Sequence, residues 1–183
     1  MLGLSGLSSR NMFEEGDVSA TILREWWKGL LADEEERARI RRCGDPAGVM
    51  LSPEYDRLLH LLKDAGYDLD PARSYAVAAV VGLVAQVASD TGPGPSFARQ
   101  MAKPVPGSKK ARISGVRFDR LLAQEQREGL YLLLIPVVDL LSGTINLADM
   151  ARSLYRWDAT ARRRWADDYY ASAPKDKCLG AMA

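Results

Sequence analysis

Basic side chains at regular spacing are the part of this sequence best suited to chemistry. On a helix beginning near Ser114, four polar side chains recur at i, i+3, i+7 and i+10 and share one stripe: Arg117, Arg120, Gln124 and Arg127. A Pro/Gly-rich loop just upstream contributes Lys109, Lys110 and Arg112. Rows of fixed cations with few groups that read bases are typical of sequence-independent nucleic-acid binding. The spacing therefore predicts a polyanion-binding surface over residues 109–127.

A second row of arginines follows near the C-terminus. Arg152, Arg156 and Arg163 recur at spacings of four and seven. An arginine on a helix face is also commonly a solvated side chain or the partner of a nearby carboxylate, and acidic residues stand close by at 158, 167 and 168. For each arginine taken singly, both interpretations stay open.

Nothing in the sequence favours an enzyme, a metal site or a cofactor. The single histidine, His60, lies in L-L-H-L-L, a pattern typical of a half-buried helix residue. Cys43 and Cys178 are far apart and form no C-x-x-C pair, so neither redox chemistry nor a structural zinc site is indicated. The G-P-G-P segment lacks the lysine and the strand–helix context of a phosphate loop. We therefore expect no catalytic residue, no metal, no cofactor and no small-molecule substrate.

Charge is distributed unevenly along a chain of ordinary composition. The 183 residues are 47% hydrophobic and 27% charged, which is typical of a globular protein. Residues 1–95 have 10 basic and 15 acidic side chains (−5), whereas residues 96–183 have 15 and 9 (+6). The longest apolar run, Tyr75–Ala88, is shorter than the roughly 20 residues of a membrane span, and no signal peptide is evident. These features predict a cytoplasmic protein with no membrane partner and one face suited to a polyanion.

Hydrophobic periodicity predicts an all-α fold of about eight helices. The first helix begins near Ser19 or Thr21, and a buried helix covers residues 74–89. A helix from about Ser114 toward Leu141 is expected to kink or break at Pro136, because proline removes a backbone donor. Four tryptophans at helical spacing are expected to anchor the core: Trp26, Trp27, Trp157 and Trp165.

These helices are expected to form two small packed bundles. The predicted divisions are a mobile leader (1–20), an N-terminal bundle (21–90), a basic Pro/Gly-rich connection (91–113), a C-terminal bundle (114–171) and a flexible tail (172–183).

Several segments in order along the chain resemble a known family. They are W-W-K-G-L-L, E-R-A-R-I-R-R, S-F-A-R-Q-M-A, V-R-F-D-R-L-L-A, I-N-L-A-D-M-A-R-S-L-Y-R-W-D and A-R-R-R-W-A-D-D-Y-Y. They are similar to the CasB family, the small subunit of type I-E CRISPR Cascade complexes, and the resemblance covers roughly residues 22–170. The resemblance implies a non-enzymatic helical protein that works as two copies with the repeated backbone subunits, the large subunit, CRISPR RNA and target DNA. It also implies weak, sequence-independent binding of nucleic acid, including the displaced DNA strand of an R-loop.

The same resemblance, placed on this sequence, implies phosphate contacts from Arg117 and Arg120. It also implies contacts from Arg37, Arg41 and Arg42 in E-R-A-R-I-R-R, and from Arg163 in R-R-R-W. Two other functions stay open. One is a helix-turn-helix regulator that reads DNA with residues 160–171, and the other is a scaffold whose cations pair with acidic protein partners.

Overall fold

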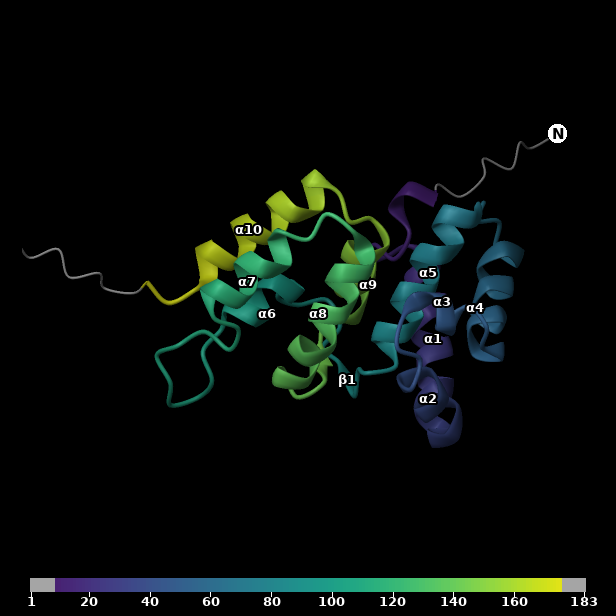
Figure 1. The fold of residues 1–183 in the computed structure, drawn as a ribbon, viewed down its shortest axis with the longest axis horizontal. Coiled ribbons are helices and arrows are strands. Elements are labelled where there is room, and N and C mark those ends of the chain that lie inside the picture. The colour runs from purple at the N-terminus through teal and green to yellow at the C-terminus, as the bar shows by residue number, and fades with distance from the viewer. Residues whose placement is uncertain (1–8, 176–183) are drawn as a thin grey trace, which may run out of the picture.

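Ten α-helices account for most of the residues that the computed structural model describes, 9–175 (Figure 1). They are α1 (Val18–Ala32), α2 (Glu34–Arg41), α3 (Pro46–Val49), α4 (Pro53–Asp64), α5 (Pro71–Val84), α6 (Phe97–Ala102), α7 (Gly115–Leu122), α8 (Arg127–Leu140), α9 (Leu147–Tyr155) and α10 (Ala159–Ser172). A short 3-10 turn, η1 (Ser9–Asn11), precedes α1, and two-residue strands β1 (Ser89–Asp90) and β2 (Thr144–Ile145) pair in parallel. The prediction of an all-α fold is confirmed, with two more helices than expected.

Short polar side chains determine where most helices begin. Each of them accepts a hydrogen bond from a backbone N–H of the first turn that has no partner within the helix. The capping residues are Asp17, Asp33, Asp45, Ser52, Asp70, Ser96, Ser114, Asn146 and Asp158. The expected cap of the first helix at Ser19 or Thr21 is wrong, because Asp17 caps α1 and Ser19 is buried, with its hydroxyl donating to the Asp17 carboxylate.

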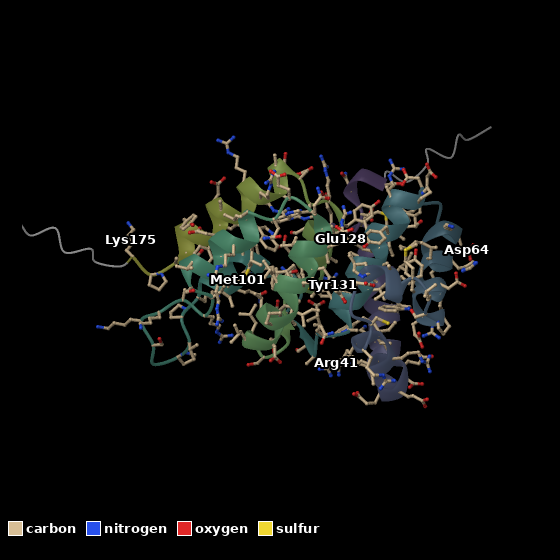
Figure 2. All side chains as sticks on the ribbon, viewed as in Figure 1. Arg41, Asp64, Met101, Glu128, Tyr131 and Lys175 are labelled. Atoms are coloured by element: carbon tan, nitrogen blue, oxygen red, sulfur yellow. The ribbon has the colours of Figure 1, made fainter. Side chains whose placement is uncertain are left out.

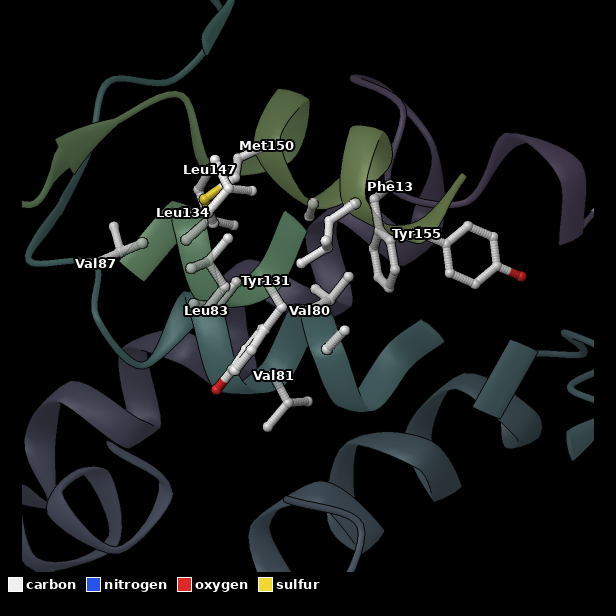
Figure 3. Packing of buried hydrophobic residues seen from close by; sticks show 14 of the residues in the cluster. Phe13, Val80, Val81, Leu83, Val87, Tyr131, Leu134, Leu147, Met150 and Tyr155 are labelled. Carbon is white, nitrogen blue, oxygen red and sulfur yellow. The ribbon is translucent and has the colours of Figure 1, made fainter. Parts of the chain in front are cut away.

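Helix α5 lies at the centre of the molecule and joins its two halves. It is buried almost all round, as its continuous Ala/Val sequence predicts. One side packs against α3 and α4 and the other against α8 and α9. Figure 3 shows Val80, Val81 and Leu83 of α5 beside Tyr131 and Leu134 of α8. The two predicted bundles therefore share one continuous hydrophobic core, to which all four tryptophans belong.

The predicted mobile leader is wrong over the part that the structure describes. Residues 1–8 lie outside the described residues, but Met12 and Phe13 are fully buried, and Ser9 donates a hydrogen bond to the Asp68 carbonyl at 2.8 Å. The Phe13 ring meets the edge of Tyr155 at 5.6 Å. Two adjacent apolar side chains are enough to fold residues 9–17 onto the core. Of the predicted tail, residues 176–183 lie outside the described residues.

The helix expected to kink or break at Pro136 is interrupted at an earlier position. Helix α7 ends at Leu122 and α8 begins at Arg127, whereas Pro136 lies inside α8. Proline leaves the carbonyl of the residue four before it without a donor. That residue, Leu132, is exposed, as is Pro136, so water can hydrogen-bond to the freed carbonyl. After α8, Thr144 and Ile145 form β2, and α9 begins at Leu147.

The basic connection is a folded segment followed by a projecting loop. Helix α6 buries Phe97, Ala98 and Met101 against α9 and α10. The loop after it is closed by an antiparallel bridge between Pro104 and Ala111, and it projects beyond α6 and α7 at the end of the molecule opposite α4 (Figure 1). Within residues 9–175, no helix combines the length and the apolar character that a membrane crossing requires.

Candidate nucleic-acid interface

A groove of about 540 Å³ lies between the basic loop, the start of α7 and the C-terminal end of α10. Its cationic lining is Lys109, Lys110, Arg112 and Arg117, and its aromatic lining is Tyr169 and Tyr170. The buried hydroxyl of Tyr169 donates to the Ile113 carbonyl at 2.6 Å, which ties the end of the loop to α10. Contact between distant parts of the chain thus brings four of the predicted site residues into one groove.

Among the residues that the structure describes, no carboxylate neutralises the cations of this region. No lysine or arginine from 103 to 120 belongs to an ion pair with another described residue. The one carboxylate of α7, Asp119, accepts a hydrogen bond from the Tyr170 hydroxyl, and this bond raises the pKa of Tyr170 to about 12. No carboxylate of the described residues lies within 4.0 Å of the guanidinium nitrogens of Arg117 or Arg120, so both stay available to an external anion.

Arg112 is the most enclosed cation of the groove. Its side chain is half-buried, and its backbone N–H donates to the Lys103 carbonyl at 3.0 Å. Its Nε is shielded from solvent and has no hydrogen-bond partner among residues 9–175. A buried guanidinium N–H without a partner is costly, so an acceptor on a bound ligand would stabilise it.

Two further predicted residues extend the basic surface beyond the groove. Arg120 lies one turn after Arg117 on α7 and is exposed. Arg163 is exposed on α10, two turns before Tyr170, so the two residues share a face of that helix roughly 10 Å apart. In the part of the chain that the structure describes, neither arginine has a carboxylate partner within 4.0 Å.

The α2 arginines lie at the other end of the molecule. Figure 2 shows Arg41 in the N-terminal half, far from Lys175 beside the groove. Arg41 is exposed and donates through Nε to the Gln86 side chain at 3.1 Å, and Arg42 is exposed beside it. Arg37 differs from both, since its guanidinium donates to the carbonyls of Ala85 (2.9 Å) and Val87 (3.2 Å). It therefore stabilises the end of α5 and is not free for a phosphate.

The predicted stripe from Arg117 to Arg127 is wrong beyond Arg120, because the chain turns between α7 and α8. Arg127 is largely buried, and this burial lowers the pKa of its guanidinium. The guanidinium donates to the carbonyls of Leu154 (2.8 Å) and Tyr155 (2.9 Å). The second predicted row is interrupted as well. Arg152 pairs with Asp149 at 2.7 Å and Arg156 with Asp158 at 2.9 Å. Of that row, only Arg163 has no carboxylate partner among residues 9–175.

The sequence prediction missed Tyr170 and placed His60 wrongly. Tyr170 is the largest exposed aromatic side chain of the described residues, at 54% exposed. The sequence did indicate this exposure. Tyr169 lies on the same buried helix face as Trp165, so the next residue, Tyr170, must point away from that face. His60 was expected to be half-buried but is exposed, with Nδ1 2.8 Å from the Asp56 carbonyl.

Helix α10 is poorly suited to reading base edges. Trp165 and Tyr169 are buried against α6 and α7, where they contact Phe97 and Phe118. The outward face includes Arg163, Asp167 and Tyr170, and α10 offers no Asn or Gln side chain to a base edge. Between residues 9 and 175, no group of three or more His, Cys, Asp or Glu side chains could hold a metal ion.

Comparisons with known proteins identify two similarities. Residues 36–170 match the family model described as CRISPR-associated protein Cse2. A chain in the crystal structure of E. coli Cascade bound to a PAM-containing double-stranded DNA target superposes with a TM-score of 0.65 at 22% sequence identity. The match covers 86% of this chain and 97% of that chain, so the two share a fold. None of the curated proteins matches the sequence.

Proposed function

The chain belongs to the Cse2 family of CRISPR-associated proteins, and on that premise we propose that it is a non-catalytic subunit of a Cascade complex guided by CRISPR RNA. Its partners there are a second copy of itself, the repeated backbone subunits, the large subunit, CRISPR RNA and target DNA. The shared fold with a chain of E. coli Cascade bound to double-stranded DNA supports this role.

Within the complex, the basic groove contacts nucleic-acid backbone without reading sequence. The observation behind this assignment is the set of lysines and arginines from 103 to 120, none of which pairs with a carboxylate of the described residues. The contacting residues that we propose are Lys109, Lys110, Arg112, Arg117, Arg120 and Arg163. Exchange of a DNA duplex for an RNA–DNA hybrid is nearly balanced in free energy, so added phosphate contacts can stabilise the opened R-loop.

Arg41 and Arg42 form a second proposed contact surface at the opposite end of the molecule. Both are exposed, and the single polar contact of Arg41 is with a neutral amide. Arg37 and Arg127 are left out, because their guanidinium groups are hydrogen-bonded to backbone carbonyls.

The backbone-contact role is tested by the salt dependence of binding. Fluorescence anisotropy would measure the affinity of the full chain for a labelled mixed-sequence DNA strand between about 50 and 200 mM salt. The double variant Arg117→Ala/Arg120→Ala should bind more weakly and lower the slope of log K against log salt by about 1.4. The matched control Arg57→Ala/Lys63→Ala removes the same formal charge from α4 and should leave the slope unchanged. Equal slopes for all three proteins, or preference for one sequence, would contradict the proposal.

Assembly is tested separately by co-purification. A tagged copy, produced together with the other complex subunits and a CRISPR array, should retain both CRISPR RNA and the partner proteins. The Arg117→Ala/Arg120→Ala variant should still assemble but hold target DNA less tightly. Recovery of the tagged chain alone would rule out the assembly role.

A further inference from the structure

Tyr170 presents an aromatic ring to the solvent inside a cationic groove. It lines the groove together with Lys109, Lys110, Arg112 and Arg117 and is 54% exposed. By contrast, every phenylalanine and tryptophan of the described residues lies in the hydrophobic core, and so do most of the tyrosines. Tyr170 is thus the exposed aromatic side chain of the described residues, and it shares its groove with cations that have no carboxylate partner there.

The orientation of this ring is fixed by its neighbours. Its hydroxyl donates to the Asp119 carboxylate on α7. Phe118 and Tyr169 meet it edge-on, with ring centroids 5.9 and 5.3 Å away and interplanar angles of 89° and 87°. Both interplanar angles are close to 90°, so neither neighbour lies flat against the Tyr170 ring, and 54% of the residue stays exposed. A fixed ring loses little conformational entropy when a planar ligand stacks on it.

We propose that the groove takes a single strand of nucleic acid, with one unpaired base stacked on the Tyr170 ring and the adjoining phosphates bound by Arg117 and the loop cations. This inference rests on the proposed function and specifies which form of nucleic acid the groove prefers. Sequence-tolerant binding of single strands combines a positively charged groove with aromatic side chains on which bases stack. A duplex offers the same phosphates, but its bases are already stacked on one another and present no free face.

Three probes separate stacking from charge, each measured by anisotropy with the full chain. They are a mixed-sequence DNA strand of about 16 nucleotides, a strand of equal length in which every base is replaced by an abasic site, and the duplex of the first sequence. The abasic strand has all of the phosphates and none of the bases. A loss of affinity confined to the first probe is therefore the signature of base stacking.

Tyr170→Ala should weaken binding of the normal single strand by about fivefold to a hundredfold. The same change should alter binding of the abasic strand and the duplex by less than about twofold. Tyr170→Phe should retain most of the single-strand affinity, because it keeps the ring and loses only the bond to Asp119. Circular dichroism and thermal melting of each variant would establish that it is folded.

Two results would overturn the inference. One is an equal loss for all three probes with Tyr170→Ala, which indicates an effect on the shape of the groove. The other is no loss for any of them. Neither result would count against the proposed function if Arg117→Ala/Arg120→Ala still lowered the salt dependence of DNA binding. Loss of that salt effect would count against the proposed function and leave the groove without a nucleic-acid role.

Discussion

Gly82 of α5 lies directly against the phenol ring of Tyr131 of α8, where a Cβ at position 82 would stand 2.5 Å from the hydroxyl oxygen and 2.9 Å from Cε2. Both residues are fully buried. Their contact lies where the N-terminal half of the molecule meets the C-terminal half. Glycine at 82 therefore allows the central helix and α8 to approach closely, at the usual cost of glycine within a helix.

Gly82→Ala should destabilise the protein. Alanine gains about 1 kcal/mol in helix propensity, but a methyl group forced into a filled core typically costs 1–3 kcal/mol, and here it would meet a large buried ring. We expect a net loss of about 1–2 kcal/mol in the free energy of unfolding, measured by urea titration.

Removing the Tyr131 hydroxyl should relieve part of that loss. This hydroxyl is buried and has no hydrogen-bond partner in the described part of the chain, and burial raises its pKa to about 12. Tyr131→Phe alone should therefore be at least as stable as the natural sequence. The double variant should be more stable than Gly82→Ala but should not recover fully, because the ring carbons stay close to the new methyl group. Simple additivity of the two changes would contradict this geometry.

Local patterns were sufficient to predict the helices and the core but not the function of individual arginines. The unbroken apolar run of α5 and the spacing of Trp165 and Tyr169 predicted burial correctly. Arg120 and Arg127 look alike in the sequence, and yet one is exposed and the other binds carbonyls 27 and 28 residues away. This difference depends on which helix ends meet in the folded protein, and a local sequence pattern does not contain that information.

The same limit explains the misplaced helix break and the folded leader. Proline breaks a helix where its missing hydrogen bond cannot be replaced, and Pro136 lies on a solvated face where water can replace it. Met12 and Phe13 have too little apolar sequence around them to show periodicity. Both nevertheless belong to the hydrophobic core, where the ring of Phe13 contacts Tyr155 of α9.

Arg127→Met should lower stability without changing the salt dependence of DNA binding. The guanidinium makes two hydrogen bonds to the C-terminal carbonyls of α9, and its loss leaves both buried acceptors without a donor. Hydrogen bonds from charged groups contribute about 1.5–3 kcal/mol each, so for two of them we expect a loss of about 3–6 kcal/mol on urea unfolding. Arg120→Met is the matched control and should show the reverse: unchanged stability within about 0.5 kcal/mol and weaker binding. Weaker binding with a smaller salt slope for Arg127→Met would show that this side chain does reach phosphate.

Arg163→Ala and Arg164→Ala should separate binding from stability at adjacent positions. Arg164 is half-buried and donates to the Ser153 hydroxyl at 2.6 Å, with the buried Asp149 carboxylate 3.7 Å away. Its removal should cost about 1–3 kcal/mol, because the surrounding groups lose a charged donor. Arg163 is exposed, so its removal should leave the melting temperature unchanged and reduce only the affinity for single-stranded DNA. Similar melting temperatures for both variants would mean that the Arg164 contacts add nothing to stability.

Asp158 should make stability depend on pH at the acidic end. It caps α10, accepting from the Ala161 backbone N–H at 2.8 Å, and it accepts from Arg156 Nε at 2.9 Å. Burial alone would raise the pKa of this carboxyl, but the two hydrogen bonds and the positive charge of Arg156 outweigh burial and hold it below its ordinary value of 3.8. A carboxyl whose pKa is lower in the folded state stabilises the fold above its unfolded pKa, and this stabilisation is lost as the pH falls through the folded value.

Asp158→Asn isolates this contribution, because asparagine keeps a capping oxygen and removes the charge. The natural protein should be the more stable of the two at neutral pH, and the difference should shrink as the pH falls below about 4. Urea titrations at several values between neutral pH and pH 3 would measure this difference. Arg156→Gln should reduce the pH-dependent part without abolishing it, since the backbone donor at Ala161 still favours the ionised form. A difference that stays constant across the range would mean that the charge of Asp158 does not contribute, and that its oxygen atoms act only as a neutral cap.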